Sequence, residues 1–379
     1  MKFIHTSDWQ LGAGFGQIPG DGGALLRTQR IKTLETIGQV AKAKGAEFIV
    51  VAGDIFDSHG VGSDTIVKAC AALRQIALPV ILITGNHDGY REPDNLYERK
   101  CWKEHCPDNV TICQTVDPVV LDQFKVVIFP CPLSRKLVIV DPTEHLAQVA
   151  ATFAKSDYLR IGLAHGPVHG FEIEDGEGGG GVIDAPGAVK NAQLDYLALG
   201  DWHGTLKVGD RIWYSGTPET DRFRNNDSGN VLLVSLDGKQ SLPVVESICT
   251  TAYEWLMENR NIQNKDDVES LKDCLKGIDR PAGKLLRIEL SGVLNMELLH
   301  ELQDVIENQR AALLYLRDYV DILLEPSPEE IAGISEGGFV RNTVEKLQAI
   351  MKSAQGEAAE DAKLALQIMY QYSKNEVVL

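Results

Sequence analysis

Five short apolar runs in this sequence each end in a polar cluster. The runs are residues 2–7, 47–52, 78–84, 159–164 and 195–199, and the clusters after them hold Asp8 and Gln10, Asp54 and Asp57, Asn86 and His87, His165, and Asp201 and His203. Uninterrupted β-branched runs are typical of strands that are buried on both faces. Helical spacing over residues 28–44 and 64–76 separates the first three runs, which predicts an α/β fold. Ligands gather at the carboxyl ends of strands in such sheets, so we expect the clusters to meet at one rim.

The remainder of the chain has a different character. Further strands are predicted at residues 116–121, 124–130, 211–215 and 231–236, and the glycine-rich residues 176–181 predict a loop, either a lid or a plain mobile connection. From about residue 246 helical segments dominate, with one strand predicted at 285–290. We therefore predict three parts: residues 1–245 with the polar clusters, an α+β accessory domain at 246–330, and a helical C-terminal segment at 331–379.

Two apolar stripes mark the C-terminal segment. Val344, Leu347 and Ile350 share one face of a predicted helix, and Leu364, Ile368 and Tyr372 share a face further on. An apolar stripe usually faces a core. Because these segments are terminal and follow a glycine-rich break, a partner-binding role stays open as the alternative.

Composition excludes some classes of protein. The formal net charge of −17 argues against a general binder of polyanions, so a nucleic-acid substrate would need a metal ion or a basic partner to offset the repulsion. Seven cysteines without a CxxC pair or a secretory signal indicate reduced thiols in a cytoplasmic protein. No apolar run reaches about 18 residues, so no membrane span is expected.

The donor types of the clusters suit metal ions. The turn Gly85-Asn86-His87-Asp88 would present an amide oxygen, an imidazole and a carboxylate together, although the same residues also form ordinary turns. Mixed oxygen and nitrogen donors suit Mn²⁺, Fe²⁺, Zn²⁺ or Mg²⁺, and the five clusters hold enough of them for two ions. A zinc cluster of Cys101, His105, Cys106 and Cys113 is a weaker alternative, because its spacing fits no usual pattern.

The order of these motifs resembles that of the calcineurin-like metallophosphoesterases. The matching residues are Asp8-Trp9-Gln10, Gly53-Asp54-Ile55-Phe56-Asp57, Gly85-Asn86-His87-Asp88, His165 and Gly200-Asp201-Trp202-His203. The segments around Ile4–Gly12 and Trp213–Glu219 look like the SbcD-type DNA repair nucleases within that family. The resemblance implies a four-layer fold of two face-to-face β-sheets flanked by helices, followed here by a C-terminal α+β accessory region.

The resemblance also implies roles for the cluster residues. One metal ion would be held by Asp8, Gln10, Asp54 and His203, and a second by Asp54, Asn86, His165 and Asp201, with Asp54 shared. His87 would contact the phosphate and help the leaving oxygen depart, and Asp57 would hold His87 in orientation. The implied activity is in-line hydrolysis of a phosphodiester, most simply by a DNA exonuclease or endonuclease.

Two positions depart from the family pattern. Gln10 and Asp201 stand where the family usually has His, which makes the site richer in oxygen and favours Mn²⁺ or Mg²⁺ over Zn²⁺. The departures leave open a catalytically impaired scaffold, and a small phosphodiester such as a cyclic nucleotide, or a phosphate ester, is an alternative substrate. The resemblance implies DNA as substrate and an SbcC-like SMC ATPase as partner. A homodimer is also open.

Overall fold

The computed structural model describes residues 1–89, 95–134, 139–153, 156–169, 181–327, 330–331, 338–353 and 356–374. The predicted glycine-rich loop at 176–181 lies outside these ranges except for Gly181, as do residues 333–337 of the second glycine-rich break. The chain forms two compact units, Met1–Glu254 and Trp255–Leu379. The three-part division at residues 245 and 330 stays a prediction.

Unit 1 contains two six-stranded sheets. In the first, the strand order is β12 (Val244–Cys249), β11 (Asn230–Ser235), β1 (Lys2–Thr6), β2 (Phe48–Val51), β3 (Val80–Ile83) and β4 (Val110–Cys113). In the second, the order is β5 (Val119–Leu121), β6 (Val126–Cys131), β7 (Leu159–His165), β8 (Tyr196–Gly200), β10 (Ile212–Tyr214) and β9 (Leu206–Gly209). Strands β1 to β4 are parallel, and so are β6, β7, β8 and β10. Each parallel set therefore delivers its carboxyl ends to one edge of its sheet.

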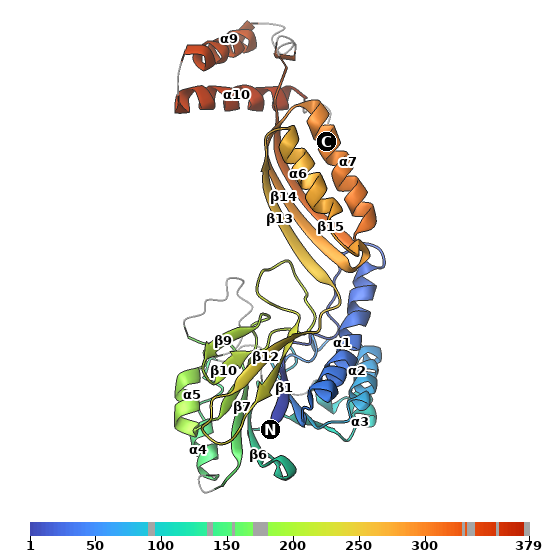
Figure 1. Ribbon diagram of the computed structural model, residues 1–379, viewed down its shortest axis with the longest axis vertical. Helices are drawn as coiled ribbons and strands as arrows, with labels where there is room; N and C mark the ends of the chain where they lie inside the picture. The colour runs from blue at the N-terminus through green and yellow to red at the C-terminus, as the bar shows by residue number, and fades with distance from the viewer. Residues whose placement is uncertain are drawn as a thin grey trace. The chain divides into compact units, whose positions relative to one another are not determined.

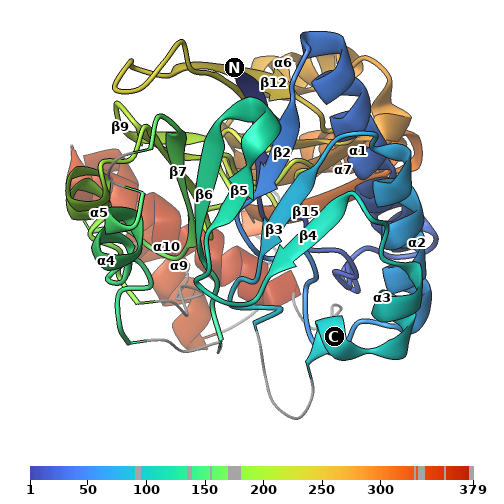
Figure 2. The same ribbon diagram turned by 90° about the horizontal axis from the view of Figure 1, so that it is seen from below.

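Helices cover the outer face of each sheet (Figures 1 and 2). The helices α1 (Gly22–Lys44), α2 (Ser63–Gln75) and α3 (Lys100–His105) pack on the first sheet, and α4 (Leu146–Ala151) and α5 (Ala185–Ala192) pack on the second. Short 3₁₀ turns occur at η1 (Leu96–Glu98) and η2 (Asp122–Phe124). The inner faces of the two sheets bury a shared core. This arrangement confirms the predicted four-layer α/β fold.

The apolar runs are uninterrupted because each strand is covered on both sides. In β2, Phe48 and Val50 point into the core between the sheets, whereas Ile49 and Val51 point to the helices. Phe48 stacks on Phe3 of β1 with ring centroids 5.1 Å apart. Neither face meets water, so no polar alternation is visible in the sequence.

Helix α1 begins earlier than predicted. The helical spacing predicted a start at residue 28, whereas α1 begins at Gly22. Leu26 and Arg30 are buried on the inner side of this helix. Their burial extends the helix across two glycines, even though a glycine in a helix is unfavourable by about 1 kcal/mol relative to alanine.

Helical segments are the larger part of the described chain after residue 246, as predicted, but three strands there were not anticipated. Strand β12 (Val244–Cys249) pairs with β11, and β13 (Glu254–Ile262), β14 (Lys284–Leu294) and β15 (Tyr315–Leu324) form a third sheet in that order. Only β14 was anticipated. Strands β14 and β15 pair in parallel from Leu285 and Tyr315 to Leu294 and Leu324. Pairing between distant segments has no local sequence period, and exposed charged residues hide the alternation in β15.

Unit 2 is an α+β structure (Figure 1). The helices α6 (Lys265–Lys276) and α7 (Met296–Ala312) pack with the three-stranded sheet around one apolar core, and the 3₁₀ turn η3 covers Pro281–Gly283. A capping box between Asn264 and Asp267 begins α6. Two further helices, α9 (Gly338–Ser353) and α10 (Glu357–Lys374), pack against each other.

Two simpler observations concern the whole described chain. All seven cysteines are free thiols, as predicted. None of the helices within the described ranges combines the length and the apolar character that a membrane crossing requires.

The buried His5 predicts a loss of stability in acid. Its Nδ1 lies 3.0 Å from the hydroxyl of Tyr196 and its Nε2 3.2 Å from the carbonyl oxygen of Leu199. Burial lowers the pKa of His5 to about 3, although the bond to Leu199 raises it. Between that value and the unfolded pKa of about 6.5, only the unfolded chain binds the proton, so stability falls as the pH falls.

We expect His5→Gln to reduce this pH dependence. Between pH 8 and pH 5, the free energy of unfolding of the native sequence should fall by about 2 kcal/mol more than that of the variant. Urea denaturation followed by circular dichroism at both pH values measures the difference. Equal pH dependence in the two proteins would show that His5 is not the group responsible.

Candidate metal centre

The carboxyl ends of five strands of unit 1, and the loops after them, carry the predicted site residues. Four of the seven predicted metal ligands have a positive φ angle, namely Asp8 at 52°, Gln10 at 47°, Asp54 at 54° and Asp201 at 105°. This region is unfavourable for residues with a side chain, by about 1–3 kcal/mol each, and such strain clusters at functional sites. Four of the ten described non-glycine residues with a positive φ are therefore predicted ligands at this rim.

Glycines allow the loops to approach one another closely. A Cβ atom on Gly85 would lie 2.1 Å from the Oδ1 of Asp54, and one on Gly53 would lie 2.4 Å from the Nδ1 of His165. Any side chain at either position would displace a predicted ligand. Glycine at these two positions therefore allows the loops to pack around the predicted ligands.

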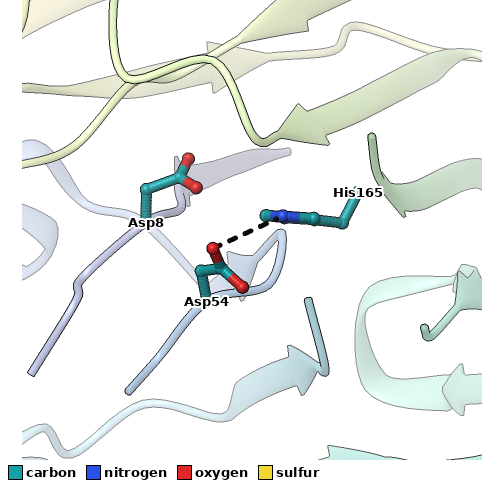
Figure 3. A group of neighbouring side chains, drawn as sticks. All are labelled: Asp8, Asp54 and His165. Carbon is teal, nitrogen blue, oxygen red and sulfur yellow. Dashed lines mark ion pairs between the residues drawn. The ribbon is translucent and has the colours of Figure 1, made fainter. Parts of the chain in front are cut away.

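Three side chains converge at the centre of the rim (Figure 3). Asp8, Asp54 and His165 each offer a ligand atom, and these atoms lie within 4.8 Å of one another. The Nε2 of His165 is 3.6 Å from the Oδ2 of Asp54. All three residues are buried. Within the described ranges they form the only such group of His, Cys, Asp or Glu, and the alternative zinc cluster at residues 101–113 does not form one.

Three more predicted ligands contact this group. The Oδ1 of Asn86 lies 2.8 Å from the Nε2 of His165, and the Nε2 of Gln10 donates to the Oδ2 of Asp54 at 2.9 Å. The Oδ1 of Asp201 is 3.7 Å from the same His165 nitrogen. Gln10 and Asp201, the two departures from the family pattern, therefore lie at the centre with the others.

His203 lies at the side of the group. Its Nδ1 is 2.8 Å from the Oδ2 of Asp221, a residue that the sequence did not single out. The main-chain nitrogen of Asp201 donates to both oxygens of Asp8, at 3.1 and 3.2 Å, which joins the loop of His203 to the loop after β1.

Crowding of buried carboxylates dominates the electrostatics. Burial, opposed by the nearby His165, raises the pKa of Asp201 to about 7. Burial also raises the pKa of Asp8, although His165 and His203 lower it. For His165, burial lowers the pKa, but Asp54, Asp8 and Asp201 raise it more, and the resulting pKa is about 9. Perturbed groups gathered in one place are typical of functional sites, and this excess of negative charge favours a cation.

Two buried oxygen atoms without a hydrogen-bond partner show whether the residues fit a metal ion. The Oε1 of Gln10 and the Oδ2 of Asp201 are buried and accept no hydrogen bond from any described residue. A buried acceptor without a partner is unfavourable, and such an atom calls for an explanation such as an ion. Both atoms belong to predicted ligands, and both are hard oxygen donors. The residues therefore fit divalent metal ions, while the individual ligand roles stay predictions.

The two residues predicted to act in catalysis lie beside the group. The main-chain nitrogen of His87 donates to the Oδ1 of Asp54 at 2.9 Å. The Nδ1 of His87 lies 2.7 Å from the carbonyl oxygen of Asp57. The contact between Asp57 and His87 is thus made by the backbone of Asp57, which the sequence could not reveal.

Asp88 does not present its carboxylate beside Asn86 and His87, contrary to the expectation for this turn. Its Oδ1 accepts from the main-chain nitrogen of Gly85, and its Oδ2 accepts from the main-chain nitrogens of Ile55 and Phe56 and from the hydroxyl of Tyr97. Four donors surround this buried carboxylate. Asp88 therefore ties the turn after β3 to the turn after β2.

Arg30 is a second supporting residue that the sequence reasoning missed. This buried side chain donates its Nε to the carbonyl oxygen of Trp9 at 2.9 Å and its Nη1 to the carbonyl oxygen of Glu219 at 3.0 Å. It joins the loop after β1 to the loop after β10. Its position four residues before Leu34, on the apolar stripe of α1, is the signal that could have identified it.

A protein family and two solved structures are similar to this chain. Residues 1–204 match the family model described as Calcineurin-like phosphoesterase. The crystal structure of TT1561 of Thermus thermophilus is similar at 14% identity, with 66% of this chain and 98% of that chain covered and a TM-score of 0.41. A second crystal structure is similar at 11% identity, with 65% and 98% covered and the same TM-score of 0.41.

Proposed function

The chain belongs to the calcineurin-like phosphoesterase family, and on this basis we propose that it cleaves phosphodiester bonds of DNA with two divalent metal ions. Metal-dependent hydrolysis of phosphoesters is the activity that family membership indicates. The motifs that resemble the SbcD-type nucleases support DNA as the substrate. The observation that carries the metal requirement is the buried group of Asp8, Asp54 and His165 with its two unpartnered oxygen atoms nearby.

The ligands divide between the two ions as the family pattern implies. The first ion would be held by Asp8, Gln10, Asp54 and His203, and the second by Asp54, Asn86, His165 and Asp201. When bound, such a pair of ions holds the phosphate, lowers the pKa of a bound water and stabilises the leaving oxygen. Asp54 is the shared ligand, and its contacts with Gln10 and His87 hold it in place.

His87 is proposed to act on the leaving oxygen. A carbonyl oxygen only accepts, so the Nδ1 facing the carbonyl of Asp57 carries a proton. The Nε2 is then the atom available to the substrate, and the side chain is 26% exposed. With Nε2 protonated, His87 can donate a hydrogen bond to the phosphate or a proton to the leaving oxygen.

A small phosphodiester, or a phosphate ester, is the second candidate substrate. The net charge of −17 favours it, because a long polyanion is repelled more strongly than a small diester. The third interpretation, a catalytically impaired scaffold, would require that the site binds no metal ion at saturating Mn²⁺.

Metal-stripped protein separates these interpretations. We expect cleavage of linear or nicked DNA to return with Mn²⁺ or Mg²⁺ and to be slower with Zn²⁺, because Gln10 and Asp201 make the donor set rich in oxygen. Nuclease assays across the ions, with metal content measured by mass spectrometry, provide the test. Best activity with Zn²⁺ would contradict the metal preference, and hydrolysis of bis-p-nitrophenyl phosphate without DNA cleavage would favour the small substrate.

Two substitutions distinguish metal binding from proton transfer. His87→Ala should keep the metal ions but slow turnover by roughly 10²–10⁴, the usual scale for a lost acid–base group. Asp54→Ala, the control, should lose both the ions and the activity. Measurements of kcat and of bound metal on the same samples test both. Full activity in His87→Ala would show that its assigned role is wrong.

The partner proposal concerns α9 and α10. On α10, the stripe of Leu364, Ile368 and Tyr372 is exposed, with Tyr372 at 73%, whereas Leu366 and Tyr370 are buried. On α9, Phe339 is 85% exposed. A row of apolar residues on the open side of a helix suits docking into a groove of another protein. We infer that an SbcC-like SMC ATPase binds here, with a homodimer as the alternative.

The exposed stripe predicts which substitutions break this association. Ile368→Ser with Tyr372→Ser should abolish co-purification of the full chain with a large coiled-coil ATPase and leave hydrolysis of bis-p-nitrophenyl phosphate unchanged. Glu360→Ser, an exposed change on the same helix, is the matched control. Undiminished co-purification of the double variant would place the partner elsewhere.

A further inference from the structure

Asp221 lies behind His203 on the loop after β10. The Oδ2 of Asp221 and the Nδ1 of His203 are 2.8 Å apart, and the two side chains are only 10% and 12% exposed. Thr217, earlier on the same loop, donates its main-chain nitrogen to the carbonyl oxygen of His203 at 3.0 Å. The loop and the histidine are therefore fastened together both by main chain and by side chain.

The hydrogen bond decides where the imidazole carries its proton. An ionised carboxylate has no hydrogen to donate, so the shared proton sits on Nδ1 of His203. In a neutral imidazole this leaves the lone pair on Nε2, which is the state that a histidine ligand needs. The Nη2 of Arg222 also approaches Nδ1, but at 3.4 Å it is the longer contact.

We propose that Asp221 is a positioning residue that fixes the tautomer and ring orientation of His203, so that Nε2 is the metal-binding atom. This inference rests on the ligand role of His203 in the proposed function. Partners of this kind typically change metal affinity by about 10–100-fold when they are removed.

Arg222 makes the two carboxylate oxygens of Asp221 different, because it binds mainly the oxygen that faces away from His203. Its Nε donates to the Oδ1 of Asp221 at 3.1 Å, while Oδ2 lies 2.8 Å from His203 and is reached by the Nη2 of Arg222 only at 3.5 Å. Each carboxylate oxygen thus has a separate main partner. An amide in the same place has one oxygen and one NH₂ group, and it cannot serve both partners in the same way.

Asp221→Asn should therefore reverse the tautomer. The amide oxygen must face the donating Nε of Arg222, because two donors would otherwise meet. The amide NH₂ then faces His203, whose Nδ1 becomes the acceptor, and the proton moves to Nε2. A protonated Nε2 has no lone pair for a metal ion, so the variant should bind metal weakly.

The experiment uses metal-free full-length protein and Mn²⁺ as the probe. Isothermal titration calorimetry should show affinity weakened by about 10–100-fold at the site that contains His203. Nitrogen-15 NMR should show His203 protonated on Nδ1 in the native sequence and on Nε2 in Asp221→Asn. Native-like Mn²⁺ affinity in the variant, or an Nε2 proton in the native protein, would overturn the proposal.

A double variant tests the directional argument. In an Arg222→Ala background the amide of Asp221→Asn can turn its oxygen to His203, so the Nδ1 proton should return. The added substitution should then change Mn²⁺ affinity by less than about threefold, well below the usual effect of losing such a partner. An unchanged loss in this background would show that the amide orientation is not the cause.

Two controls separate this result from other effects. Asp227→Asn removes one exposed carboxylate from the same loop and should leave the His203 tautomer unchanged. Circular dichroism confirms that each variant is folded. Because the readouts are metal binding and the tautomer, a protein that binds Mn²⁺ but does not cleave DNA would refute the proposed substrate while leaving this inference intact.

Discussion

The burial of several carboxylates at one rim is the constraint on which the rest of unit 1 depends. Asp8, Asp54 and Asp201 approach one another around His165, and their side chains are at most 5% exposed. Burial disfavours the charged form of a carboxylate, and it raises the pKa of Asp8 and Asp201. Carboxylates held this close together therefore either keep their protons or require a cation. Burying these carboxylates without a cation therefore destabilises the folded protein, whereas the same carboxylates favour the binding of a metal ion.

The surrounding fold holds this arrangement through residues that are not themselves ligands. Asp88 binds two turns together, and Arg30 joins the loops after β1 and β10. These bonds offset backbone strain at Asp8, Gln10, Asp54 and Asp201, which at about 1–3 kcal/mol each is large relative to the stability of a domain. The predicted ligands are therefore held in position without an ion, and such preorganisation favours binding.

The negative net charge of the chain affects how a DNA substrate would reach the metal centre. With a net charge of −17, DNA is not attracted by the protein as a whole. Bound metal ions would supply positive charge where the phosphate must lie. In the proposed function, the exposed stripe on α10 is the surface on which a separate DNA-holding protein docks. In the proposed function, chemistry and DNA binding are then divided between two chains.

Sequence alone determined the fold class of unit 1 and predicted the polar residues that gather at its rim. Strands buried on both faces need apolar side chains at every position, so they and the polar residues that end them are visible without a structure. The same reasoning failed for β12, β13 and β15, because pairing between distant segments has no local period. It also could not place the boundary of α1, which burial of Leu26 and Arg30 extends to Gly22.

Tertiary structure decided the directions of the side chains. Asp88 faces backbone donors and not the centre, Asp57 uses its carbonyl oxygen, and Leu364 with its stripe lies exposed. The partner of His203 is Asp221, from a loop beyond two intervening strands. Hydrogen bonds depend on distances of a few tenths of an ångström between segments that are remote in the chain, and residue order carries no record of those distances.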